Sequence, residues 1–234
     1  MKKILLTILV AIILIPQIGL AAIGYDNASH SGFLNGTSNN LSHTTSGTDR
    51  LLMVYIYSTI DNVTGVTYNG TAMTFVQKQL MTGAAAGQYI HAYILENPTT
   101  GANTVTVTSS SGLGGYISAV SYTGAKQTGQ PDNSTKQAAN PVTTLTTSLT
   151  TVANNSWLVG YSYMNGSMTG GTDTTLRGGS ISGVLEAMDS NGAKSPAGSY
   201  GLTTDANSGF AGHVMASISP VPEEATEDII WFFF

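Results

Sequence analysis

Short apolar and β-branched runs, separated by turn-forming residues, recur along the chain. Residues 51–57 form such a run and suit a strand buried on both faces. Residues 104–108 alternate polar and apolar side chains, as a strand with one solvent face does. Residues 89–95 and 116–122 read as further strands, and Asn69-Gly70 is a hairpin signal because both residue types tolerate positive φ. No helical period of ten or more residues follows the first 21 residues, so the sequence predicts an all-β fold.

The two halves of the chain resemble each other. Residues 111–119 (SGLGGYISA) and 208–216 (SGFAGHVMA) are identical at four of nine positions, with an offset of 97 that aligns Tyr116 with His213. Upstream, residues 49–58 (DRLLMVYIYS) also parallel residues 155–164 (NSWLVGYSYM). We therefore predict a two-sheet antiparallel β-sandwich of the jelly-roll type, in which two pseudo-repeated halves interleave. Chance similarity in a sequence of low diversity, or two tandem domains, are the alternatives.

The first 21 residues have the character of a secretory signal peptide. Lys2 and Lys3 precede an apolar stretch at 4–15, and small residues precede a cleavage point after Ala21. An uncleaved membrane anchor is the alternative, although Pro16 interrupts a spanning helix. We predict a secreted or cell-surface protein.

The remaining chain divides into a single β-sandwich domain at residues 22–220 and a tail at residues 221–234. The tail is acidic and then apolar, ending in the hexad IIWFFF. It is predicted either to be a truncated anchor or to pack on its own domain.

Composition narrows the function classes. Of the 234 residues only 9% are charged, the formal charge is −5, and there is no cysteine. Eight basic residues without a basic stripe argue against nucleic-acid binding. The absence of cysteine excludes disulfides and thiolate chemistry, and favours a bacterial or phage-related source.

Three turn and strand motifs carry a family resemblance. They are VTYNG at 66–70, YxxxNPxxG at 93–101 and SYxG at 121–124. With these motifs the chain resembles a loosely defined group of exported, lectin-like or jelly-roll β-sandwich domains of bacterial and phage surface proteins. The resemblance spans about residues 25–220. It implies a domain displayed outside the cell, and it brings no catalytic residue with it.

No catalytic constellation is visible. The four histidines are dispersed, and the acids of the central part of the chain are isolated. Glu186 and Asp189 are the closest acidic pair, but their odd spacing places them on opposite faces of a strand. We therefore predict no catalytic residue and a protein that is not an enzyme, with a glycoside hydrolase as a minor alternative.

Calcium is the one candidate cofactor, and otherwise none is predicted. Asp189 with Asn191, and Asp205 with Asn207, place oxygen ligands in turns of the kind that Ca²⁺ can use. The same spacing is used by ordinary Asx turns, which is the simpler interpretation.

Aromatic residues supply candidate ligand contacts. Trp157, Tyr161 and Tyr163 fall at even spacing, on one face of a strand. This face is either a platform for sugar rings or part of the core, and the aligned first-half strand favours the core. Tyr200 and Phe210 are further candidates near turns.

These features predict a secreted, non-enzymatic surface module with a structural or adhesive role. A carbohydrate-binding, lectin-like module is the alternative. The predicted partners are an extracellular glycan or a surface protein, with no nucleic acid, and with membrane contact only through the leader or the tail.

Overall fold

A computed structural model describes residues 22–179, 181 and 183–222. The predicted leader and residues 223–234 of the predicted tail lie outside the described residues. Within them, no helix has the length and apolar character needed to cross a membrane.

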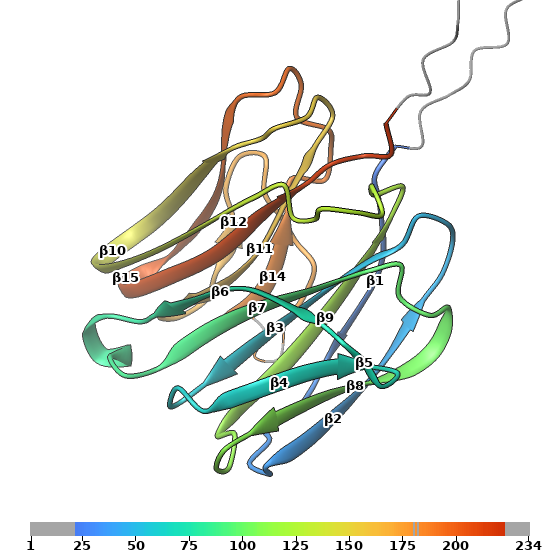
Figure 1. The fold of residues 1–234 in the computed structure, drawn as a ribbon. Helices are drawn as coiled ribbons and strands as arrows, with labels where there is room; N and C mark the ends of the chain where they lie inside the picture. The colour runs from blue at the N-terminus through green and yellow to red at the C-terminus, as the bar shows by residue number, and fades with distance from the viewer. Residues whose placement is uncertain (1–21, 180, 182, 223–234) are drawn as a thin grey trace, which may run out of the picture.

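The described chain forms three antiparallel sheets that stack in layers (Figure 1). The middle layer, here the central sheet, has five strands. In spatial order they are β1 (Gly24–His30), β9 (Gly115–Thr123), β3 (Leu51–Ser58), β7 (Tyr89–Glu96) and β6 (Thr74–Leu80).

One face of the central sheet is covered by the N-terminal outer sheet. Its strands are β2 (Ser38–Thr45), β8 (Gly101–Ser109), β4 (Val63–Tyr68) and β5 (Thr71–Ala72). A 3₁₀ turn, η1 (Gly83–Ala85), lies between β6 and β7.

The other face of the central sheet is covered by the C-terminal sheet. Its strands are β10 (Asn133–Thr150), β15 (Ser199–Ile218), β11 (Trp157–Met164), β14 (Leu185–Asp189) and β13 (Thr175–Leu176), with β12 (Thr169–Gly170) paired to β15. The strands of this sheet all come from the second half of the described chain.

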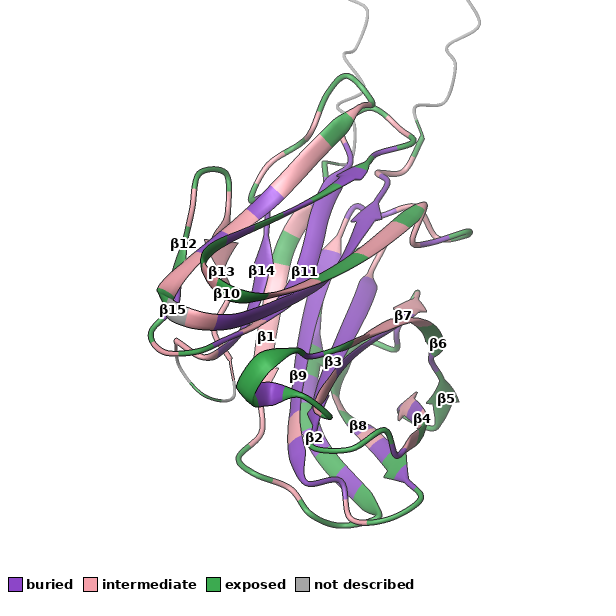
Figure 2. Ribbon diagram, turned by 90° about the vertical axis from the view of Figure 1, so that its left-hand side faces the viewer, coloured by how far each residue is buried: buried purple, intermediate pink, exposed green. Residues whose placement is uncertain are grey.

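The layering explains the apolar run in β3, every residue of which is buried. Leu52, Val54 and Ile56 face the N-terminal outer sheet. The alternate residues, from Leu51 to Tyr57, face the C-terminal sheet. A strand between two layers has no solvent face, which is why it lacks polar alternation. Figure 2 shows the same concentration of buried residues in β3 and β9.

The two long strands of the C-terminal sheet bend and cover its second face. Residues 211–218 of β15 pair with β11, whereas residues 199–205 pair only with β10 and β12. The register shifts between Ala139 and Thr144, and Gly209 has a φ of 153°, where an added Cβ would lie 2.4 Å from the Asn165 amide nitrogen. Beyond the bend, residues 144–150 and 199–205 form a flap, here the outer arm. Its Leu149 and Leu202 pack on Leu158, Met188 and Met215 of the C-terminal sheet.

The all-β class and the antiparallel sandwich are confirmed, but the predicted pair of interleaved sheets is wrong. There are three sheets among the described residues, and none contains strands from both halves. The physical reason is that strands close in sequence pair with one another. The halves meet through side chains instead.

Aromatic pairs cross the contact between the halves. Tyr55 of β3 stacks on Tyr161 of β11, with ring centroids 5.2 Å apart and an interplanar angle of 10°. Tyr57 meets Tyr163 edge to face at 5.0 Å. The sequence comparison of residues 49–58 with residues 155–164 aligns Tyr55 with Tyr161 and Tyr57 with Tyr163. The strands β3 and β11 therefore face each other with aligned residues in contact.

Two opposite ends of the three-layered stack can be distinguished by the strands and chain ends that lie there. Both ends of the described chain leave from the same end, here the terminal end (Figure 1). At the opposite end, here the distal end, β3 finishes at Ser58 and β11 finishes at Met164.

Candidate binding site

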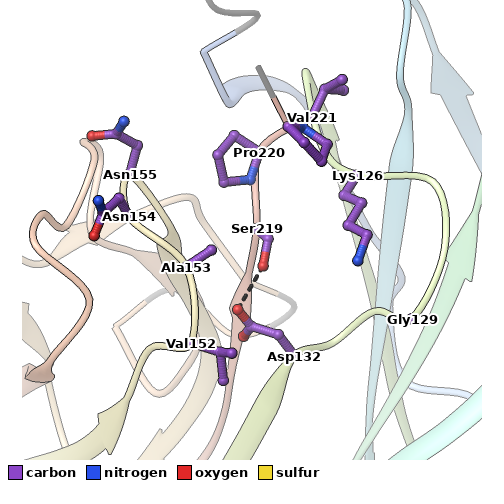
Figure 3. Close-up of a pocket in the computed structure, with 11 residues that line it drawn as sticks. Lys126, Gly129, Asp132, Val152, Ala153, Asn154, Asn155, Ser219, Pro220 and Val221 are labelled. Carbon is purple, nitrogen blue, oxygen red and sulfur yellow. Dashed lines mark hydrogen bonds between the residues drawn. The ribbon is translucent and has the colours of Figure 1, made fainter. Parts of the chain in front are cut away.

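Two adjoining hollows open at the terminal end, and they share Asn155 and Pro220. The first has a volume of about 350 Å³ and the second about 380 Å³. Figure 3 shows the first hollow, which is edged by three segments: the connection between the halves, the loop after β10 and the end of the described chain.

The polar groups of the first hollow are largely bonded within the protein. Asp132 accepts hydrogen bonds from the hydroxyl groups of Ser217 and, at 2.5 Å, Ser219 (Figure 3). Asn154 accepts one from the Ala197 N–H at 2.7 Å. The Lys126 backbone N–H donates to the Ser219 carbonyl at 2.9 Å. The connection between the halves is thus fixed along the end of β15 and lines the hollow with Lys126, while the loop after β10 contributes Asn155.

The second hollow is more apolar and contains the leading sequence candidate. Ala22, Ile23, Ala193 and Pro220 line it together with Trp157. Trp157 is only 7% exposed and packs edge to face on Tyr122, with centroids 6.1 Å apart. The indole is therefore chiefly a core group, and the alternative of an open ligand platform is not favoured by its burial.

The other aromatic candidates lie in different places. Tyr161 is fully buried in the contact between the halves. Tyr163 and Phe210 touch at the distal end, with centroids 4.9 Å apart. Tyr200 lies on the outer arm, where its hydroxyl donates to the Pro196 carbonyl at 2.7 Å. The structure does not bring the five residues into one site.

The first calcium candidate pair is engaged by a cation of the protein itself. Asp189 is fully buried and binds Arg177 through Nε at 2.7 Å and a terminal nitrogen at 3.0 Å. Arg177 also donates to Asn191 at 2.6 Å and lies over the Tyr25 ring at 4.2 Å. Tyr122 donates to Asp189 at 3.2 Å. Sequence reasoning missed Arg177, because no local spacing links it to Asp189.

The second calcium candidate pair lies on the outer arm and at its bend. Asp205 accepts a hydrogen bond from the Thr144 hydroxyl at 2.5 Å, and Asn207 is exposed. Across the described part of the chain, no three His, Asp or Glu side chains group in a way that could hold a metal ion.

Sequence reasoning also missed buried histidine networks. His213 is fully buried, with Nε2 at 2.7 Å from the Thr204 hydroxyl and Nδ1 at 3.0 Å from the Thr147 hydroxyl. Burial lowers the pKa of His213 to about 3. The alignment of His213 with Tyr116 is off by one residue: Gly212, not His213, pairs with Tyr163 as Tyr116 pairs with Tyr57.

A second network joins a carboxylate, a serine and a histidine in the first half. Ser121 donates to Asp26 at 2.7 Å and contacts His43 Nε2 at 3.1 Å. Burial lowers the pKa of His43 to about 4. The carboxylate bonds the serine rather than the imidazole, and Ser121 and His43 are buried. In a catalytic triad the histidine lies between the serine and the carboxylate, where it can accept the serine proton. Here the serine lies in the middle, so the arrangement does not activate it as a nucleophile.

The two acids weighed as a hydrolase pair also have separate environments. The Glu186 carboxylate accepts the Gly183 N–H at 2.6 Å, and burial raises its pKa. Asp189 is held by Arg177, as described above. Their side chains bind different partners.

No protein-family model, curated protein or solved structure matches the chain.

Proposed function

We propose that this protein is an exported surface module of bacterial or phage origin, with a structural or adhesive and non-enzymatic role. The observation that carries the proposal is the chemistry of its two outermost faces. They lie on opposite sides of the stack, and both are rich in hydroxyl side chains.

The outer face of the N-terminal outer sheet is uncharged. Its outward positions are Ser38, Asn40, Ser42, Thr44, Thr67, Thr104, Thr106 and Thr108. Thr106 donates to Asn40 across the strands at 2.9 Å. A regular face of this kind is well suited to contact over a broad area of a hydrated surface. Because it carries no charges, the desolvation cost of such contact is small.

The outward face of the outer arm repeats this chemistry. It presents Thr144, Thr146, Ser148, Thr150, Ser199, Thr203 and one acid, Asp205. Thr146 and Thr203 are hydrogen-bonded across the strands at 2.8 Å. One molecule could therefore contact two surfaces at once. Linking two binding faces in one molecule gives an avidity higher than the affinity of either face alone.

The similarity of the faces fits a finer proposal about the fold. We infer that each half is a jelly roll and that the halves are related copies. The central sheet has the order β1-β9-β3-β7-β6, and the C-terminal sheet has β10-β15-β11-β14-β13. The two orders match if the long β10 corresponds to β1 and β2 together, and the long β15 to β8 and β9 together. The strands β11, β14 and β13 then correspond to β3, β7 and β6.

Binding of the chain from residue 22 onward to insoluble cell-wall polysaccharide tests the proposed role. We expect it to co-sediment, and we expect Thr106→Lys combined with Thr203→Lys to weaken retention about tenfold, or ~1.4 kcal/mol. Leu80→Lys is the control, since Leu80 is 46% exposed on β6, away from both outer faces and both terminal hollows. No retention of the unmodified chain, or equal loss in the control, would overturn the proposal.

Carbohydrate recognition in the terminal hollows is the second candidate, favoured by the presence of both Trp157 and Asn155 in the lining of one hollow. Asn155 has a φ of 60°, so Asn155→Gly removes the amide and keeps the backbone conformation. Under this alternative Asn155→Gly abolishes polysaccharide binding, whereas binding that persists would exclude the hollow as its site.

A further inference from the structure

We propose that an aromatic cluster at the distal end binds the apolar faces of sugar rings in a neutral glycan. The cluster consists of Phe33, Tyr57, Tyr116, Tyr163 and Phe210. The inference rests on the proposed adhesive role and names a partner and a site for it, separate from the terminal hollows and the outer faces.

The five rings form a continuous path from the contact between the halves to solvent. Phe210 meets Tyr163 at 4.9 Å, and Tyr163 meets Tyr57 at 5.0 Å. Tyr57 then meets Tyr116 at 5.9 Å, and Tyr116 meets Phe33 at 5.5 Å. Phe33 is 59% exposed, Tyr116 and Tyr163 are half-buried, and the other two rings are buried. The buried rings thus support others that solvent reaches.

The backbone fixes the exposed rings before any ligand arrives. Leu34, next to Phe33, exchanges two backbone hydrogen bonds with Gly115, at 2.8 and 2.9 Å. A Cβ on Gly115 would lie 1.9 Å from the Tyr57 carbonyl oxygen, so only glycine permits this close approach. Gly115 in turn places Tyr116 beside Tyr57. Rings held in this way lose little conformational freedom on binding.

The chemistry of the cluster matches a neutral sugar. Aromatic faces stack on the C–H groups of a sugar ring, and nearby hydroxyl groups can bond its hydroxyls. Burial raises the pKa values of Tyr57 and Tyr163, so both hydroxyls stay protonated and uncharged at neutral pH. The acid of the loop after β3, Asp61, is paired with Lys78. A charged ligand would find no unpaired counter-charge among these groups.

The position of the cluster also suits contact with a partner. It lies at the end opposite both ends of the described chain, so attachment through either end leaves it accessible. It draws on both halves, with three residues from the first and two from the second.

The test compares two exposed phenylalanines with similar surroundings. Phe33 contacts Tyr116 at 5.5 Å and 71°, while Phe75 contacts Tyr93 at 5.4 Å and 69° but lies on β6, outside the cluster. Phe75 is 49% exposed. Phe33→Ala and Phe75→Ala therefore remove comparable rings, and only the first belongs to the proposed site.

Affinity electrophoresis of the chain from residue 22 onward, in gels containing soluble laminarin, mannan, xylan or dextran, measures the binding. We expect at least one of these neutral glycans to retard the unmodified protein. Phe33→Ala should raise its dissociation constant about tenfold or more, and Phe75→Ala less than about twofold. Tyr116→Phe keeps the ring and should have an intermediate effect.

No retardation by any of the four glycans would overturn the inference, and so would equal loss in the two phenylalanine variants. Preference for a charged glycan, such as alginate, would also overturn it. The co-sedimentation assay separates this outcome from failure of the adhesive role. If the unmodified chain co-sediments with cell-wall material but none of the four glycans retards it, the distal site is wrong while the adhesive role stands.

Discussion

The buried imidazole of His213 makes the protein sensitive to acid. Thr147 donates its own hydrogen to Gln137 at 3.2 Å, so it must accept from His213 Nδ1. The neutral ring then accepts a hydrogen bond at Nε2 from Thr204, which can in turn accept from Ser162 at 3.3 Å. Protonation of Nε2 reverses this chain and places a charge in a site without solvent.

The size and sign of the effect follow from the pKa. His213 has a pKa of about 3 in the folded protein, against about 6.5 in an unfolded chain. Because the folded value is the lower one, the contribution to stability is complete above pH 6.5 and is lost as the pH falls toward 3. The free energy of unfolding therefore drops by about 2 kcal/mol at pH 5 and about 3 kcal/mol at pH 4 through this residue alone.

Urea denaturation at pH 7.5 and pH 5.0, followed by near-ultraviolet circular dichroism, measures this loss. His213→Gln keeps a donor and an acceptor but does not titrate. At pH 7.5 the free energy of unfolding of the variant should be about 2 kcal/mol lower than that of the unmodified protein. On going to pH 5.0, however, the variant should lose about 2 kcal/mol less of it than the unmodified protein does. His30→Gln is the control, because the His30 ring is only partly buried and should carry less of the effect. If His213→Gln and the unmodified protein lose stability equally on acidification, the reasoning is wrong.

Three further predictions concern other buried polar groups. The Tyr55 hydroxyl is buried without a hydrogen-bond partner, so Tyr55→Phe should leave stability unchanged or raise it by up to about 1 kcal/mol in urea denaturation. Asp189→Asn leaves the Arg177 charge unpaired and should cost about 3 kcal/mol, whereas Asp173→Asn, at an ion pair whose acid is 67% exposed, should cost less than about 0.5 kcal/mol. Equal costs would refute this assignment. Because Arg177 already occupies Asp189, millimolar calcium or a chelator should shift the melting temperature by less than about 1 °C in a thermal scan, and a larger rise with calcium would reveal a site.

The strands of the first half could be predicted because their local signals agree with the fold. The run at 51–57 became β3, and Asn69-Gly70 forms the predicted hairpin turn, with φ values of 48° and 78°. In the second half, β10 continues through Pro141 by way of shifted register, and β12 and β13 have two residues each. Short strands and a bent one leave little periodicity to read. The partners of Asp189 and His213 could not be predicted either, since they depend on register between segments far apart in sequence.

The off-by-one alignment of His213 has a consequence for the distal cluster. A shift of one residue moves a side chain to the opposite face of its strand. His213 therefore points toward the outer arm, and Gly212 takes the place that Tyr116 has in the first half. A Cβ at Gly212 would lie 2.4 Å from the Met81 sulfur, so the turn after β6 fills the space that a second tyrosine would need. Under the proposed duplication, a symmetric pair of halves would carry two aromatic clusters, one on each flank of the contact between them. Because the second half has Gly212 at this position, with Met81 packed against it, only one aromatic cluster is formed by the described residues. Under the proposed function, each molecule should then bind a single sugar-ring segment at its distal end and still present two hydroxyl-rich faces.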